Sequence, residues 1–443
     1  MSTQPRPVNR RARTARIVIA ALTLAVLGLL AVVVRLSWPA TYPEAPWAEL
    51  PPEEAGAPWT SSDDTYRAPE SDRLDDGWHA LNTAMREKDR EAFLAFASGE
   101  AEEQMARWWD NTSRIGWDTA YMLPAGGHSE PVREVFLGAE LAFSASPARG
   151  SGSPDAGLRL TQGFPYHVTV EGEGMDLQIT SLEPVYEMPW DQGELHVVTR
   201  EHVVLYGLAD EADLVEATAD DAERAAIIAL ESIERLSGQT YTDGFVSAIT
   251  NDEERFLEWQ WSPGIDAAGF ARPTSRPFTS DYLPVDVAVG EESSGMLVML
   301  GPGSADQRLS TFVHEFGHAL HYLAQPVESG RGDLSASEGF ARFFEEYSGV
   351  EDIYYDFRVK NIVATEGLES FSADALRDAG NPDRVAIAYA AAGLYFRFVD
   401  ETGGDAWQVA LDAFHSGAGL EAAISSAGPE FSESAWQAWV ASL

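Results

Sequence analysis

The sequence contains no cysteine. This absence excludes disulfide bonds, and it excludes zinc and iron–sulfur sites that are held by thiolates. A transition metal bound by this chain must therefore take its ligands from histidine and carboxylate side chains.

Positive charge is also scarce. Lysine occurs only at Lys88 and Lys360, and 30 basic residues face 71 acidic ones, which leaves a formal net charge of -41. Because attraction to phosphate needs a basic face, we expect no nucleic-acid partner. An acidic surface keeps a protein soluble, and the alternative is that it attracts cationic peptides.

Long apolar runs are absent except at the start of the chain. Residues 17–34 carry no charge, and Thr23 is their only polar side chain. This run predicts a transmembrane anchor at residues 17–38, with the arginine-rich residues 1–16 as a cytoplasmic basic tail. The folded domains would then be extracytoplasmic, on a single-pass protein of the cell membrane. A cleaved signal peptide is the competing interpretation.

Composition divides the rest of the chain. Residues 39–72 are rich in proline and acid and predict an extended linker. Residues 73–190 begin with helical periodicity and continue with alternating, β-rich segments, which predicts a small α+β module. This element order resembles that of nuclear-transport-factor-like modules, which are cone-shaped. The resemblance implies either that the module binds a ligand inside its cone or that it is a spacer domain. Residues 191–443 form the second predicted domain.

A capped helix carries the main chemical motif of the second domain. The segment 304–323 reads SADQRLSTFVHEFGHALHYL, and Ser304 with Gln307 predicts a capping box at its start. Its apolar residues share one face, whereas His314 and His318 lie on the other. Two histidines one turn apart suit a single tetrahedral zinc, and Glu315 can reach a water on that metal.

A third protein ligand must come from elsewhere, because His321 and Ala324 stand where the HExxHxxGxxH pattern has its glycine and third histidine. Glu338 follows His318 by 20 residues, on the next helix that carries acids. We expect it to complete the site; the alternative is that it only caps its own helix with Ser335.

Three neighbouring polar residues have less specific predictions. His321 is expected near the cleft or exposed on the surface. Glu345 returns to the face of Glu338 and could orient a ligating histidine. For Glu345 and Glu346 together, a solvated helix face is the alternative.

The residues His314–His318 and Glu338–Glu345 resemble the gluzincin branch of zinc metallopeptidases, which are peptidase MA-like. His314–His321 also resembles the active-site helix of thimet-type oligopeptidases, and Tyr389–Gly404 resembles the helix after the site. The resemblance implies Zn2+ as cofactor, a peptide or protein substrate, and Glu315 as the general base. It also implies an oxyanion-stabilising tyrosine.

For that tyrosine the candidate is Tyr389, with Tyr395 in reserve. We further expect the buried strand 296–300 to offer its edge to an extended substrate. The predicted fold class is α+β: a transmembrane helix, the nuclear-transport-factor-like module, and a mainly helical zincin-like metallopeptidase domain. The predicted function is a membrane-anchored zinc metallopeptidase. The alternatives are an inactive peptidase scaffold that binds or regulates, and a structural surface protein without metal.

Overall fold

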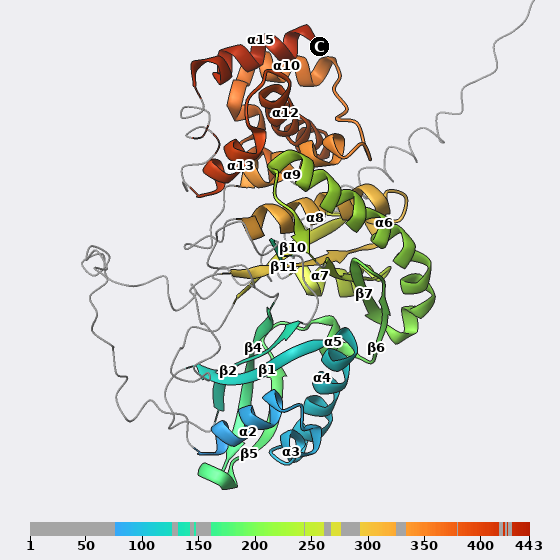
Figure 1. Ribbon diagram of the computed structural model, residues 1–443, viewed down its shortest axis with the longest axis vertical. Helices are drawn as coiled ribbons and strands as arrows, with labels where there is room; N and C mark the ends of the chain where they lie inside the picture. The colour runs from blue at the N-terminus through green and yellow to red at the C-terminus, as the bar shows by residue number, and fades with distance from the viewer. Residues whose placement is uncertain are drawn as a thin grey trace, which may run out of the picture. The chain divides into compact units, whose positions relative to one another are not determined.

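The computed structural model describes most of the chain after residue 75, and these residues belong to one compact unit (Figure 1). The described residues are 76–125, 132–141, 146–147, 161–242, 244–260, 267–275, 293–324, 334–378, 380–415, 420, 423 and 428–443.

The predicted membrane anchor requires a correction. Among the described residues, no helix combines the length and apolar character that crossing a membrane requires. The predicted span at 17–38 lies outside the described residues, as do the predicted basic tail at 1–16 and the linker at 39–72. The described structure therefore gives no support to the predicted transmembrane helix, to the single-pass topology or to the extracytoplasmic placement.

The first described elements are three helices followed by an antiparallel sheet. The helices are α2 (Asp76–Arg86), α3 (Arg90–Leu94) and α4 (Ala101–Ile115). The strands are β1 (Trp117–Ala125), β2 (Val132–Leu141), β4 (Thr161–Glu171) and β5 (Gln178–Pro184), in the spatial order β1-β2-β4-β5. Helices thus precede an antiparallel sheet, in the predicted order. The likeness to a nuclear-transport-factor-like module stays a prediction.

A second, five-stranded sheet follows in the chain. Its strands are β6 (Leu195–Thr199), β7 (Val203–Leu208), β9 (Phe245–Ile249), β10 (Gly269–Ser275) and β11 (Ser293–Leu300), in the order β10-β11-β9-β7-β6. The three central strands run parallel, and the two outer ones are antiparallel to their neighbours. The domain predicted at 191–443 is therefore less purely helical than expected. A further short pair joins β3 (Ser146–Pro147) to β8 (Tyr241–Thr242).

Both faces of the five-stranded sheet are covered. Along β11, Val298 and Leu300 belong to one hydrophobic core, whereas Leu297 and Met299 belong to the other. Side chains of a strand alternate between faces, so a strand buried on both sides reads as a continuous apolar run. The first core continues into the helices after β11, and the second continues into residues of α2, α3, α4, β1, β2, β4 and β5.

Helices of the second half surround the first core. They are α6 (Ala212–Ser237), α8 (Arg308–Ala324), α9 (Leu334–Tyr347), α10 (Phe357–Glu366), α11 (Ala373–Leu376), α12 (Pro382–Glu401), α13 (Ala406–His415) and α15 (Glu433–Ser442). α8 packs against α6 and α9, and α9 packs against α12 (Figure 1). Alanines line the buried side of α6, which lets helices approach closely.

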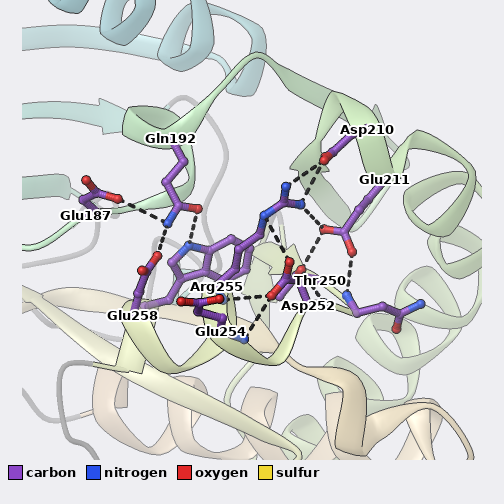
Figure 2. Close-up of polar contacts among 11 residues, drawn as sticks. Glu187, Gln192, Asp210, Glu211, Thr250, Asp252, Glu254, Arg255 and Glu258 are labelled. Atoms are coloured by element: carbon purple, nitrogen blue, oxygen red, sulfur yellow. Dashed lines mark hydrogen bonds and ion pairs between the residues drawn. The ribbon is translucent and has the colours of Figure 1, made fainter.

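Polar contacts hold α5 (Pro189–Gln192) and α7 (Glu253–Gln260) in place (Figure 2). The guanidinium of Arg255 pairs with Asp210 at 2.7 Å and with Glu211 at 3.3 Å. The amide of Gln192 donates to Glu258 and accepts from the indole of Trp259. These contacts connect the segment that leads into the five-stranded sheet with the helix that precedes β10.

Candidate metal centre

α8 carries the HExxH motif, but it begins later than predicted. The helix starts at Arg308, after a short 3-10 turn at Pro302–Ser304. The hydroxyl of Ser304 donates to the carbonyl of Gly301 instead of capping the helix. The carbonyl of Gln307 accepts from the backbone N–H of Thr311. The predicted capping box is therefore wrong, because Ser304 stabilises the turn before the helix.

The two faces of α8 have separate roles. Phe312, Phe316 and Leu320 are fully buried, and the ring of Phe316 stacks on Phe245 of β9 at 3.9 Å between centroids. This apolar side fixes the helix on the sheet. The opposite side presents His314 and His318 to α9, as the periodicity predicted.

Three side chains converge between α8 and α9. The Nε2 atoms of His314 and His318 lie 3.2 Å apart, and Oε2 of Glu338 lies 3.3 Å from the first and 3.4 Å from the second. Zinc bonds of about 2.0–2.1 Å in tetrahedral geometry require ligand atoms about 3.3–3.4 Å apart. The three atoms form a triangle of this size, so the group could hold a metal ion. Glu338 therefore lies where its role as third ligand requires.

Electrostatics in this triangle favour an ionised carboxylate. Burial alone would raise the pKa of Glu338, but the charge of His318, the hydrogen bonds from both imidazoles and the charge of His314 outweigh it. The pKa of Glu338 is therefore held well below its usual range. Burial lowers the pKa of His314, and the hydrogen bond to Glu338 with the charges of Glu315 and Glu338 raises it by more. A dication at this place would replace the proton on the imidazole.

Outer contacts fix the direction of both imidazoles. Nδ1 of His314 lies 2.6 Å from Oε1 of Glu345, and Nδ1 of His318 lies 2.9 Å from Oγ of Ser337. With Nδ1 engaged in this way, Nε2 of each ring faces the other ligands. The predicted role of Glu345 agrees with this geometry. Ser337 was missed, although its place directly before Glu338 is a usable signal.

Glu315 has the environment of a general base. Its side chain is buried, with 5% of the residue exposed, and Oε2 has no hydrogen-bond partner among the described residues. Burial raises the pKa of Glu315, the two histidine charges oppose this, and Glu338 adds to it, so that the net pKa is raised. A raised pKa brings a carboxylate closer to the range in which it exchanges protons at neutral pH.

The two candidate tyrosines of α12 differ. The ring of Tyr389 lies 6.4 Å from that of His314. Burial, followed by the charges of Glu338 and Glu315, raises the pKa of Tyr389, so the hydroxyl stays protonated. Tyr395 is fully buried, and its hydroxyl donates to the carbonyl of Phe431 at 3.2 Å. The reserve prediction for Tyr395 is wrong, because this side chain belongs to the core.

His321 also lies in the core and not at the surface. It is 1% exposed, and its ring lies 4.9 Å from Phe340 and 5.9 Å from Trp407. The face of α8 that bears it is covered by α9 and α13, which the sequence pattern of one helix could not reveal. Glu346 in turn pairs with Arg397 of α12 at 2.7 Å.

The strand next to the site is β10. β11 pairs with β10 on one side and with β9 on the other, so the predicted free edge at 296–300 is wrong. β10 pairs, among the described residues, with β11 alone. A Cβ at Gly269 of β10 would lie 3.1 Å from Oε1 of Glu315 and 2.9 Å from Cγ2 of Thr311. Glycine at this position thus lets the strand begin close to the carboxylate without displacing either side chain.

A second group of acidic and imidazole side chains has a simpler explanation. Glu201, His202 and Glu223 bring three possible ligand atoms together near the β6–β7 turn. One oxygen of Glu223 lies 2.8 Å from Nδ1 of His202, and the other accepts from the His202 backbone N–H at 2.9 Å. Both oxygens are thus used in hydrogen bonds that hold the turn on α6.

Comparison with known proteins assigns no family and no function to this group of side chains. The sequence matches no protein-family model and no curated protein. The resemblance to gluzincins and to thimet-type oligopeptidases therefore stays a prediction that rests on the motif residues. The triangle of His314, His318 and Glu338 is what the structure contributes: a group of side chains that could bind a metal ion.

Proposed function

We propose that this chain is a zinc-dependent metallopeptidase, in which His314, His318 and Glu338 hold the metal. The size of the donor triangle carries the proposal, because its edges of 3.2–3.4 Å match a tetrahedral zinc site. Two nitrogens and one carboxylate oxygen are also the donor types that a cysteine-free chain can offer to zinc. A bound zinc would polarise a carbonyl and acidify a water.

The residues beside the triangle supply the other functions that hydrolysis needs. Glu315 is buried with an oxygen that is free of described partners, so it can accept a proton and return it to the leaving amine. Tyr389 holds a protonated hydroxyl beside the triangle, so it can donate to an oxyanion. An inactive scaffold has no need for an unengaged, buried carboxylate, and Glu315 therefore favours catalysis over the alternative of a binding protein.

β10 makes a peptide the favoured substrate class. Among the described residues this strand is hydrogen-bonded to one other strand, β11, and it begins close to Glu315. An extended peptide could pair with its outer backbone groups and would then run past the general base.

Replacement of Glu315 tests the proposal. Glu315→Gln keeps the shape and the metal ligands but removes the base, so we expect turnover of a peptide library to fall about a thousandfold. Zinc, measured by elemental analysis, should remain at one equivalent. Glu346→Gln is the matched control, because its carboxylate pairs with Arg397 away from the triangle. Undiminished turnover in Glu315→Gln, or zinc without any hydrolysis in the wild type, would contradict the proposal.

A further inference from the structure

Arg342 lies on α9 one turn after Glu338 and binds a carboxylate that touches the metal centre. Its guanidinium pairs with Oε2 of Glu345, with Oε1 of Glu351 at 3.3 Å, and with the carbonyl of Asp352 at 2.9 Å. The Arg342 side chain is 14% exposed, and that of Glu345 is 8% exposed. The pair is therefore largely shielded from water.

The carboxylate of Glu345 is shared between two partners. Oε1 lies 2.6 Å from Nδ1 of His314, and Oε2 pairs with Arg342. A buried carboxylate that lost one charged partner would either rotate or become costly to keep ionised. Arg342 therefore decides which way the Glu345 carboxylate points, and Glu345 decides which way the His314 ring points.

The side chain of Arg342 packs against α12. A Cβ at Gly393 would lie 3.0 Å from Cγ of Arg342 and 2.9 Å from Cδ1 of Ile353. Glycine at this position thus leaves room for the stem of the arginine between α9 and α12. The contacts to Glu351 and Asp352 then fix the guanidinium from the turn after α9.

We propose that Arg342 is a positioning residue for the metal centre, which sets the affinity for the metal by orienting Glu345 and, through it, His314. This inference rests on the proposed function in so far as zinc is the metal. It adds a connection from the triangle to the turn at residues 351–352, through an ion pair that never touches the metal.

Arg397 offers a matched control. It is an arginine between the same two helices, it pairs with Glu346 at 2.7 Å and with Glu401 at 2.8 Å, and it contacts neither Glu345 nor His314. A general loss of α9–α12 packing should therefore affect Arg342 and Arg397 variants alike. A positioning role should affect only the Arg342 variants.

The experiment is a zinc titration of the full chain against a competing chelator. We expect Arg342→Met, which keeps the apolar stem, to raise the Kd for zinc about tenfold, and Arg342→Lys to raise it less. Arg397→Met should stay within about twofold of the wild type. Because Arg342 acts through Glu345, the double variant Arg342→Met/Glu345→Gln should bind zinc no more weakly than Glu345→Gln alone.

A milder variant covers the case in which Arg342→Met does not fold. Gly393→Ala keeps the charge but displaces the arginine stem, and it should raise the Kd about threefold. An unchanged Kd in folded Arg342→Met, or in Gly393→Ala if the first does not fold, overturns the inference. So does an equal rise in Arg397→Met, or effects of Arg342→Met and Glu345→Gln that simply add.

The outcomes separate this inference from the proposed function. A wild type that binds zinc and hydrolyses peptides, with unchanged affinity in Arg342→Met, overturns the inference alone. A wild type that binds zinc without hydrolysis contradicts the peptidase proposal, and the ratio of affinities still tests Arg342. A wild type that binds no zinc overturns both.

Discussion

Two carboxylates, one beside each hydrophobic core, have pKa values shifted in opposite directions. Glu338 lies between two imidazoles on the first-core side of the five-stranded sheet, and its pKa is well below the usual range. Asp191 of α5 lies in the second-core region beside Tyr166 and Met188, and burial raises the pKa of Asp191 to about 7. Burial alone would raise the pKa of both groups.

Their neighbours account for the difference. Asp191 accepts from the hydroxyl of Tyr166 at 2.8 Å and from the backbone N–H of Met188 at 3.1 Å, and both donors are neutral. These bonds and the more distant charge of Arg107 only reduce the effect of burial, and Glu187 adds to it. Glu338 instead has two side chains that can carry positive charge. A buried carboxylate between imidazoles can therefore keep the charge that a cation needs, whereas one with neutral donors is driven toward its protonated form.

Loss of the carboxylate charge should separate the two sites most clearly. Three protein ligands share a zinc-binding free energy of about 10–16 kcal/mol, so Glu338→Gln should cost about 4 kcal/mol, or roughly a thousandfold in affinity. Asp191→Asn should leave zinc affinity unchanged. Chelator competition measures both. Equal losses of zinc in the two variants would break the distinction between the cores.

Each of the two carboxylates has a tyrosine nearby, and removal of that tyrosine's hydroxyl tests the same distinction. Tyr389→Phe should lower kcat about a hundredfold with zinc retained, because an oxyanion donor is lost. Tyr166→Phe should leave kcat within about twofold. It should instead lower the free energy of unfolding by about 1 kcal/mol, because Asp191 loses a hydrogen bond. Steady-state kinetics and urea unfolding measure the pair, and an unchanged kcat in Tyr389→Phe would remove this tyrosine from the mechanism.

The smallest expected effect is the pH dependence of stability that Asp191 confers. Its pKa in the folded chain is above the unfolded value, so its contribution is complete below about pH 4 and is lost as pH rises through about 7. The unfolding free energy of the wild type relative to Asp191→Asn should fall by about 1 kcal/mol between pH 6 and pH 8, the range in which the folded group loses its proton. Urea midpoints across this range measure it. The exposed Glu102→Gln variant serves as the control and should show no such trend.

Local periodicity was enough to predict where several residues of the candidate metal centre lie. The spacing in SADQRLSTFVHEFGHALHYL placed the apolar residues of α8 in the core and brought His314 and His318 to the other face. The next acid-bearing helix supplied Glu338 and Glu345, both of which lie beside the histidines. Within α8 the predicted placement agrees with the structure, because residues of one helix have fixed angular relations. The roles of these residues as ligands stay predictions.

Predictions that depended on neighbours distant in the chain were less reliable. Strand 296–300 was correctly read as buried, but its two partners, β10 and β9, could not be read from its own residues. Tyr389 and Tyr395 are six positions apart on one helix, and only the packing of α12 brought one to the site and the other to Phe431. Arg342 and Ser337 belong to no sequence motif that predicts a contact with the site, so their contacts were not foreseen.

Composition and motif spacing limit which chemistry is available to this protein. Without cysteine, a metal must be held by histidine and carboxylate, and the HExxH spacing puts two imidazoles on one side of a helix. The distances between the three candidate ligand atoms, and the carboxylate that keeps its charge, became visible only in the folded chain. Distances between helices and the pKa of a buried group depend on packing between segments far apart in the chain, which no local pattern contains.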